Sequence, residues 1–198
     1  MKLNWAELLV VNNPLRVFEQ RFEIGWMKKH ARLSPAGSFL EIGCGRGAGA
    51  SIIREEFSPA FLCATDLDPM MMKRAVRYLD EPDRQGIFFC AADALRLPLR
   101  DSVFDAVFGF GVLHHVPDWQ GALAEIARVL KPGGTYFLEE LYPSLYQNFI
   151  TRHILLHPEE NRFTSPELKE ALDSAGFSVA ASLEVKFAGI LAVLQKVS

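Results

Sequence analysis

The sequence contains little cysteine, and its cysteines are arranged neither as pairs nor as ligands. Among 198 residues there are three, Cys44, Cys63 and Cys90, with no CxxC spacing and no histidine cluster beside them. An odd number of scattered cysteines is typical of small buried side chains in a reducing compartment. We therefore expect no disulfide and no metal site, and we predict a cytoplasmic location.

Long apolar runs are also missing. The run near the end of the chain, Phe187–Leu194, has eight residues, whereas a bilayer-spanning helix needs about 20. The first 14 residues contain one lysine, an early acidic residue at Glu7 and too short an apolar stretch for a signal peptide. The sequence thus predicts no membrane span.

A surplus of positive charge is absent as well. The chain has 21 Lys and Arg against 24 Asp and Glu, a formal net charge of −3, which argues against binding nucleic acid by bulk electrostatics. The short basic run Lys28, Lys29, His30 and Arg32 is interpreted as a solvated helix face, so a nucleic-acid partner is disfavoured. The content of 49% hydrophobic and 23% charged residues is that of an ordinary folded domain.

Strands and helices alternate along most of the chain. Residues 1–35 are predicted to be helical on either side of a turn signal at Asn12–Pro14. The repeated strand–helix units that follow predict a parallel sheet with helices on both faces. The expected strands are Ser38–Ile42, Phe61–Thr65, Ile87–Ala91, Phe104–Phe108, Thr135–Glu139, Phe177–Leu183 and Ala188–Gln195. The last two lie too close together for a crossover helix, so we expect them to pair antiparallel.

The expected helices extend from the glycine cluster to Phe57, from Pro69 to Leu79, from Pro117 to Leu130 and from Ser165 to Gly176. Asp68 is the expected N-cap of the second, with Pro69 in its first turn. The chain has no repeat and no low-complexity linker, and we interpret it as a single α/β domain. Its parts are a helical cap (1–35), a ligand-binding core (37–140), an insert (141–163) and a closing helix and hairpin (164–198).

The residues after the strands are the most informative, because an open parallel sheet binds ligands outside the carboxyl ends of its strands. Glycines at 43, 45 and 47 permit a tight turn and a close approach of a ligand to the backbone. On its own, Gly43-x-Gly45-x-x-Ala48 also fits the dinucleotide fingerprint. Glu41 breaks this tie, because a carboxylate here disfavours a bound pyrophosphate and suits a ligand that carries an ammonium or sulfonium group. The alternative is that Glu41 bonds only to neighbouring backbone.

Further acids follow the second and third strands. Asp66 comes about 20 residues after the glycine loop, where an acidic side chain accepts hydrogen bonds from ribose hydroxyls. Asp68 is better explained as a helix cap. Asp93 is placed to accept from an exocyclic amine, and a turn role alone is the competing interpretation.

Five sequence blocks occur in order and at family-like separations: EIGCGRG, TDLDP, AADALRLPL, FDAVFGFGVLHHVPD and RVLKPGGTYFLEE. Together they resemble the class I S-adenosylmethionine-dependent methyltransferases, especially the group that includes the ubiquinone/menaquinone-biosynthesis methyltransferases. The similarity covers about residues 37–140, and FTSPELKEALDSAGF extends it to the final helix and strand. The resemblance implies a Rossmann-like sheet of seven strands in the order 3-2-1-4-5-7-6, with strand seven antiparallel. It also implies S-adenosylmethionine as the cofactor.

The resemblance assigns the methionine half of the cofactor to the glycine loop. Glu41, Gly43 and Gly45 are expected to lie along it, with Cys44 between the two glycines. The turn Lys131–Gly134 is structural in this family and receives no catalytic role.

The adenosine half falls, by the same resemblance, on the ends of the next strands. Asp66 is expected to hold the ribose and Leu67 to pack on the adenine face. Asp93 is expected to accept from the adenine amine, and the backbone N–H of Ala94 to bond a ring nitrogen. Gly109–Phe110, at the end of strand four, are expected to flank the sulfonium and to present carbonyl groups to the ammonium.

Methyl transfer is an in-line displacement in which positioning and desolvation supply much of the catalysis, and some acceptors also need a general base. His115, after strand four, is a candidate base, as are Glu140 and Tyr142 at the end of strand five. Their neighbours His114 and Glu139 lie on the same side. The competing interpretation is that the His-His pair has a local structural part.

Acceptor choice in this family usually depends on the N-terminal helices and the insert after strand five, here residues 1–35 and 141–163. Their aromatic residues either form an apolar lid over the acceptor or dock the helices onto the sheet. They are Trp5, Phe18, Phe22, Trp26, Tyr142, Tyr146 and Phe149. We expect a small organic acceptor of a quinone-like or lipid-like kind. The sequence has no Asn-Pro-Pro-Tyr-like block of the kind associated with methylation of amino groups on bases, so a nucleic-acid substrate is disfavoured.

Two other functions stay open at this point. A nicotinamide-dependent oxidoreductase is disfavoured by Glu41 and by the later blocks. A non-catalytic adaptor that only binds the cofactor has the same cofactor motifs, so only turnover separates it from an enzyme.

Overall fold

The computed structural model describes residues 13–146 and 161–197. Its centre is a seven-stranded sheet in the order β3-β2-β1-β4-β5-β7-β6, the order implied by the family resemblance. The strands are β1 (Ser38–Ile42), β2 (Phe61–Asp66), β3 (Ile87–Ala91), β4 (Phe104–Phe110), β5 (Leu130–Leu141), β6 (Phe177–Val185) and β7 (Gly189–Lys196). The first five are mutually parallel, and β7 runs antiparallel to both β5 and β6, as predicted.

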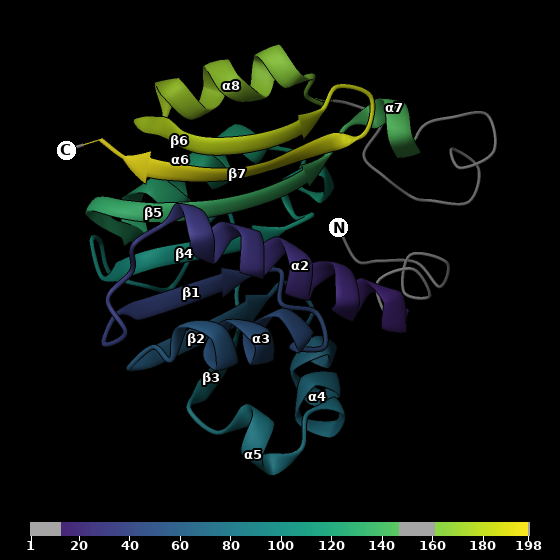
Figure 1. Cartoon of the computed structure of the whole chain (residues 1–198), viewed down its shortest axis with the longest axis vertical. Coiled ribbons are helices and arrows are strands. Elements are labelled where there is room, and N and C mark those ends of the chain that lie inside the picture. The colour runs from purple at the N-terminus through teal and green to yellow at the C-terminus, as the bar shows by residue number, and fades with distance from the viewer. Residues whose placement is uncertain (1–12, 147–160, 198) are drawn as a thin grey trace.

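Helices cover both faces of this sheet (Figure 1). They are α2 (Pro14–His30), α3 (Ala48–Phe57), α4 (Pro69–Tyr78), the short α5 (Glu81–Arg84), α6 (Trp119–Val129), the short α7 (Pro143–Tyr146) and α8 (Ser165–Ser174), with a 3-10 turn η1 at Leu113–His115. The sequence pattern missed α5, α7 and η1, because three or four residues are too few to show a helical period. No described helix is long and apolar enough to cross a bilayer.

The helix starts follow from local chemistry. Asn13 accepts a hydrogen bond from the Leu15 N–H at 3.0 Å and precedes Pro14, so the predicted turn signal is the start of α2. Asp68 caps α4 as predicted, accepting from the Met70 N–H at 3.1 Å. Both caps satisfy backbone donors that a helix start leaves without intrahelical partners.

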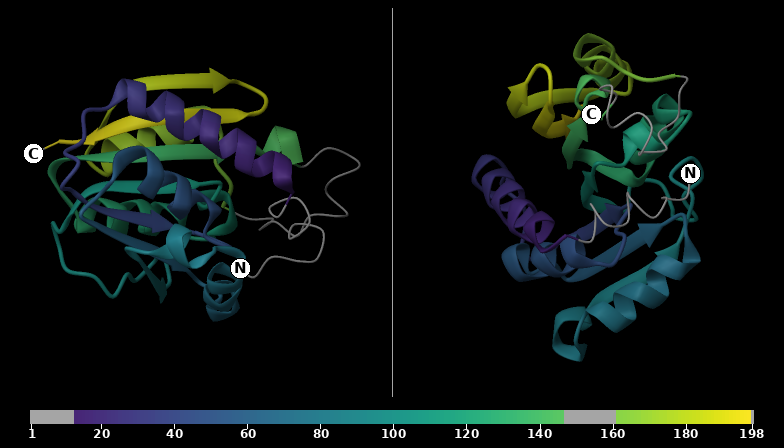
Figure 2. Two further views of the ribbon diagram at one scale, coloured as in Figure 1. Left: turned by 60° about the horizontal axis from the view of Figure 1, so that its bottom comes forward. Right: turned by 90° about the vertical axis from the view of Figure 1, so that its right-hand side faces the viewer.

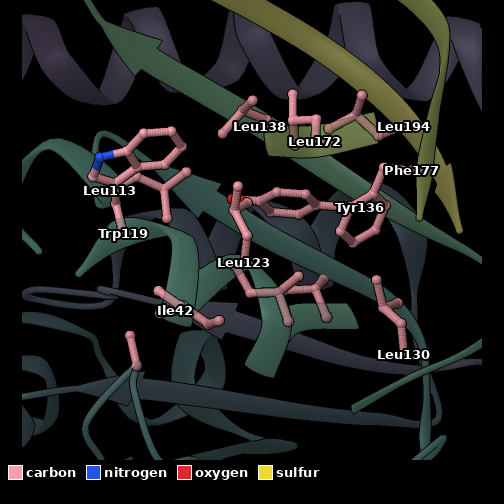
Figure 3. Packing of buried hydrophobic residues seen from close by; sticks show 14 of the residues in the cluster. Ile42, Leu113, Trp119, Leu123, Leu130, Tyr136, Leu138, Leu172, Phe177 and Leu194 are labelled. Atoms are coloured by element: carbon pink, nitrogen blue, oxygen red, sulfur yellow. The ribbon is translucent and has the colours of Figure 1, made fainter. Parts of the chain in front are cut away.

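Two apolar cores lie on the two faces of the sheet. On one face, Leu123 of α6 and Leu172 of α8 lie over Ile42 and Tyr136 of the sheet (Figure 3). On the other, α2 and α3 cover Phe39, Phe108 and Phe137 of the sheet. Phe57, the last residue of α3, packs its ring against all three. Phe108 and Phe137 stack with their ring centroids 4.5 Å apart. Burial of each aromatic side chain stabilises the fold by roughly 1.5–3 kcal/mol. Because both faces of the sheet are packed in this way, the strand ends are held in fixed positions.

The start of β5 differs from the prediction. Leu130 already pairs with Phe104, and the next pair is Thr135 with Ala106, so β5 advances five residues while β4 advances two. The predicted Lys131–Gly134 turn therefore lies inside the strand as a wide irregularity, with Gly133 at a φ of +70°. Pairing with a neighbouring strand is a tertiary property, which the local turn signal does not contain.

Candidate active site

A pocket opens at the carboxyl ends of β1 to β4. These strand ends point to the right in Figure 1. Its walls come from the loops after all four strands, which is the position expected for a ligand of an open parallel sheet. The lining residues are Ile42, Gly43, Gly45, Asp66, Leu67, Asp68, Met71, Ala92, Asp93, Ala94, Phe110, Gly111, Val112, His115 and Val116.

The glycine loop after β1 makes one wall. Gly43 and Gly45 have φ angles of +71° and +52°, which favour glycine. A Cβ on Gly43 would lie 2.5 Å from a methyl group of Val112, so Gly43 permits close packing of two loops. A Cβ on Gly45 would meet no atom within 4 Å, so the absence of a side chain there keeps the backbone open to the pocket.

Asp66 connects that loop to β2. Its Oδ2 accepts from the Gly45 N–H at 3.0 Å, and its Oδ1 accepts from the Asp68 N–H at 2.9 Å. Burial raises the pKa of Asp66, and the two backbone bonds act in the opposite direction. A carboxylate oxygen has a second acceptor position, so Asp66 holds the loop and still offers acceptor capacity to a ligand in the pocket.

Asp68 and Asp93 also lie on the wall, and both have local roles. Asp68 is the cap of α4 described above. Asp93 accepts from the Leu95 N–H at 3.0 Å, the turn-forming bond that the competing interpretation predicts. Leu67 is 47% exposed and Ala94 is buried beside them, so this side of the pocket combines an apolar surface with acceptors.

Glu41 lies behind the wall rather than on it. Its side chain is fully buried, it accepts a hydrogen bond from the Ala50 backbone, and its Oε2 has no partner among the described residues. Burial, together with the charge of Asp66, raises the pKa of Glu41 to about 8. A Cβ on Gly49 would collide with this carboxyl group. The backbone bond predicted by the alternative interpretation is present, and one oxygen remains unsatisfied beside it.

Cys44 and Gly109 are likewise absent from the lining. Cys44 is buried, which raises the pKa of its thiol. Gly109 faces the side of the sheet that α6 and α8 cover, where a Cβ would lie 3.1 Å from the hydroxyl oxygen of Tyr136. The predicted contacts of these two residues with the cofactor stay predictions.

Glu140 lies under the loop that follows β4. Its Oε1 accepts from the backbone N–H groups of Val112 at 2.8 Å and Leu113 at 2.6 Å. Its Oε2 accepts from the His114 N–H at 3.4 Å and lies 2.7 Å from His114 Nδ1. The side chain is buried and points at backbone donors, so Glu140 fixes the shape of a pocket wall from behind.

His115 is the one predicted catalytic candidate that lines the pocket. Its ring centroid is 4.2 Å from that of His114, which Glu140 holds. Tyr142 instead is buried and donates to Glu184 on β6 at 2.8 Å, and burial raises its pKa. The structure therefore separates the three candidates, with Glu140 and Tyr142 outside the lining.

The aromatic residues expected to form a lid do not share one location. Phe18 and Phe22 on α2 are exposed and face away from the sheet. They do not dock α2 onto the sheet, and they do not line the pocket. Trp26 is half-buried against the α2–α3 core. Trp5, Phe149 and the side chain of Tyr146 lie outside the described residues.

Met71, Val112 and Val116 form an apolar wall of the pocket, and Gly111 also lines it; none of these four residues was predicted from the sequence. Gly111 has a φ of +65° and donates its N–H to the Glu139 carbonyl at 2.8 Å. A signal for it was available, because a second glycine follows the strand at Gly109-Phe110-Gly111.

A model of the methyltransferase domain family matches residues 40–138. Phthiotriol/phenolphthiotriol dimycocerosates methyltransferase 1 of Mycobacterium ulcerans is 37% identical over 105 residues, 53% of this chain and 38% of that protein. The fatty-acid O-methyltransferase of Mycolicibacterium smegmatis is 30% identical over 148 residues, 75% of this chain and 46% of that protein. The chain thus spans less than half the length of these relatives.

Solved structures of other methyltransferases share the fold. An S-adenosylmethionine-dependent methyltransferase from Aquifex aeolicus superposes with a TM-score of 0.78 at 18% identity, covering 99% of this chain and 100% of that one. One from Mesorhizobium loti has a TM-score of 0.72 at 16% identity, covering 87% and 97%. The family match, which spans half of the sequence, the strand order and the pocket at the strand ends all indicate the same family. The chain belongs to the class I S-adenosylmethionine-dependent methyltransferases.

Proposed function

We propose that this chain transfers a methyl group from S-adenosylmethionine to an oxygen atom of a lipid-like small molecule. The observation that carries the proposal is the pocket at the ends of β1 to β4, where the open backbone at Gly45 lies beside the carboxylate of Asp66. The oxygen and the lipid-like class come from the names of the relatives, a fatty-acid O-methyltransferase among them.

The residues present fit the cofactor. Gly45 leaves space for a ligand at the backbone, and Asp66 keeps acceptor positions for hydroxyl groups. Leu67 and Met71 give the adjoining wall an apolar surface for a flat ring. Glu41 has an unsatisfied buried oxygen one residue before the pocket wall, which favours a ligand with a positive charge.

The cofactor, when bound, supplies a methyl group already activated by a sulfonium. The chain then has to orient the acceptor, exclude water and, for a hydroxyl acceptor, receive a proton. Phe110, Val112 and Val116 form an apolar wall of the pocket at the end of β4. We place the acceptor against this wall. His115 lies on that wall, and we propose its imidazole as the proton acceptor.

The proposed function is tested by measuring release of S-adenosylhomocysteine with fatty acids, long-chain alcohols and quinols as acceptors. We expect turnover with a lipid-like acceptor, and His115→Ala to lower it about a hundredfold for a hydroxyl acceptor with unchanged affinity for S-adenosylhomocysteine. Tight binding of S-adenosylhomocysteine without turnover on any acceptor would favour the adaptor. Binding of NAD in its place would favour the oxidoreductase.

A cytoplasmic location is part of the same proposal. It rests on Cys44, Cys63 and Cys90, which are free thiols, as suits a reducing compartment.

A further inference from the structure

Helix α2 has two apolar faces, and one of them covers nothing that the structure describes. On the inner face, Ile24 and Met27 are fully buried against the sheet. On the outer face, Leu15, Phe18 and Phe22 are 67%, 75% and 64% exposed. Their spacing places these three side chains, the outer stripe, along one side of the helix. Large exposed apolar groups gathered on one face are a mark of an interaction site.

Ion pairs on both flanks hold the outer stripe toward solvent. On the flank facing α3, Arg21 bonds Glu55 at 2.8 Å and Lys28 bonds Glu56 at 3.1 Å. On the other flank, Arg16 bonds Glu139 of β5 at 2.7 Å. A rotation that buried the stripe would break these pairs. Figure 1 shows α2 in front of the sheet, and the right view of Figure 2 shows it at the outer edge of the molecule.

The segment that carries the stripe is basic although the protein is acidic. Residues 13–33 contain five Lys and Arg against two Glu, in a chain whose net charge is −3. Three of the five cations form the ion pairs with Glu139, Glu55 and Glu56 described above. Lys29 is exposed and lies seven residues after Phe22, so it extends the line of the outer stripe, and Arg32 is exposed just beyond the helix. An aromatic and aliphatic stripe that ends in cations is complementary to a surface with apolar chains below anionic headgroups.

We propose that the outer face of α2 docks on an anionic lipid surface. The outer stripe enters the boundary between headgroups and acyl chains, and Lys29 and Arg32 lie against the headgroups. A second copy of the chain is a poorer occupant, because a two-fold contact would place the same segment, with its surplus of cations, against itself. Three side chains also fall short of the roughly 800 Å² per partner that a stable interface buries.

Docking in this way orients the pocket. The stripe lies in the N-terminal half of α2, and Arg16 in that half bonds Glu139 near the carboxyl end of β5. The Glu139 carbonyl accepts from Gly111 of the pocket wall, so the outer stripe and the pocket lie toward the same end of the sheet. Docking would let a lipid-like acceptor enter the pocket from the lipid surface. This step rests on the proposed function, whereas the docking itself does not.

The experiment is cosedimentation of the full chain with vesicles of phosphatidylcholine, alone or mixed with phosphatidylglycerol. We expect binding to the mixed vesicles, lowered about tenfold to a hundredfold in the double variant Phe18→Ser/Phe22→Ser. Lys29→Glu/Arg32→Glu is expected to remove the preference for the anionic lipid. Phe88→Ser is the matched control, because Phe88 is 57% exposed on β3, away from α2, and we expect it to bind as the parent does.

Absence of vesicle binding by the parent chain, or equal loss in the Phe88 control, would overturn the proposal. A dimer seen by light scattering that the Phe18/Phe22 double variant dissociates would overturn it in favour of a second copy. Melting temperature and affinity for S-adenosylhomocysteine are measured for every variant. Because neither depends on vesicles, a failure of lipid docking is distinguishable from a failure of the proposed methyl transfer.

Discussion

The Oε2 atom of Glu140 lies 2.7 Å from Nδ1 of His114, and the same carboxyl group accepts from the backbone N–H groups of residues 112 to 114. A side chain of β5 thus fixes the loop that follows β4. A ring N–H at His114 Nδ1 would donate to this carboxyl group as the three backbone N–H groups do. The ring of His114 in turn packs on His115 at the pocket.

We predict that Glu140→Gln destabilises the fold and the pocket together. The side-chain NH2 group of Gln, which replaces one carboxylate oxygen, cannot accept a hydrogen bond. At least one buried N–H therefore loses its partner, at a cost of about 1–3 kcal/mol. Thermal denaturation is expected to show a lower melting temperature, and calorimetry a weaker affinity for S-adenosylhomocysteine. Glu170→Gln, on the exposed side of α8, is the control and is expected to change neither. A variant that kept stability and affinity but lost turnover would make Glu140 a catalytic residue instead.

Asp66 and Asp68 are expected to separate affinity from helix capping. Asp66→Ala removes an ionisable acceptor whose hydrogen bonds are worth roughly 1.5–3 kcal/mol each, so we expect cofactor binding to weaken by about tenfold to several hundredfold. Asp68→Ala removes the cap of α4, which costs about 1 kcal/mol of stability with little change in affinity. Dissociation constants and melting temperatures of both variants check this. The reverse pattern would place the ribose on Asp68.

Glu41 is expected to release a proton when the cofactor binds. Its pKa of about 8 in the free protein leaves the carboxyl group mostly protonated at pH 7, and a cation beside it lowers that pKa. Calorimetry at pH 7 in buffers of different ionisation enthalpy should then show release of up to about one proton with S-adenosylhomocysteine. Adenosine, which has no ammonium group, and Glu41→Gln are the controls, and neither should release a proton. Equal release by Glu41→Gln would contradict a role of Glu41 at the ligand.

Much of the fold could be predicted from the sequence because its signals are local. Asp68 before Pro69 predicted the helix cap, and Asp68 accepts a hydrogen bond from the Met70 N–H. Gly176 predicted the end of α8, and the structure gives this residue a φ of +81°, which favours glycine. The strand order came from the resemblance, and the sheet confirms it. The start of β5 was missed because the pairing of Leu130 with Phe104 depends on a distant strand.

The site was less predictable, because it depends on partners far away in the sequence. Alternation along β5 places Glu139 and Glu140 on opposite faces of the sheet, yet it does not say what each one meets. Glu139 meets Arg16, 123 residues away, and Glu140 meets the loop at His114. Position at a strand end therefore located the pocket, and only the packing showed which acids face it.

The final prediction concerns Arg16, which bonds Glu23 at 2.9 Å and Glu139 at 2.7 Å between α2 and the sheet. Burial, followed by the charge of Glu139, raises the pKa of Glu23 from 4.5 to about 7, while Arg16 opposes that rise. A group with a raised folded pKa contributes stability that is complete below the unfolded pKa and is lost as pH rises through the folded value. Removing Arg16 makes the loss larger, because two buried carboxylates then ionise without a cation.

Arg16→Met is therefore expected to change the free energy of unfolding little at pH 5 and to lower it by about 1–3 kcal/mol at pH 8. Arg21→Met is the matched control, because its partner Glu55 is exposed and has a lowered pKa. We expect that variant to lose less than about 1 kcal/mol, equally at both pH values. Urea denaturation of the parent and both variants at pH 5 and pH 8 measures the difference. An Arg16→Met loss that is the same at both pH values would mean that Arg16 stabilises α2 by packing its aliphatic stem, because that contribution does not titrate.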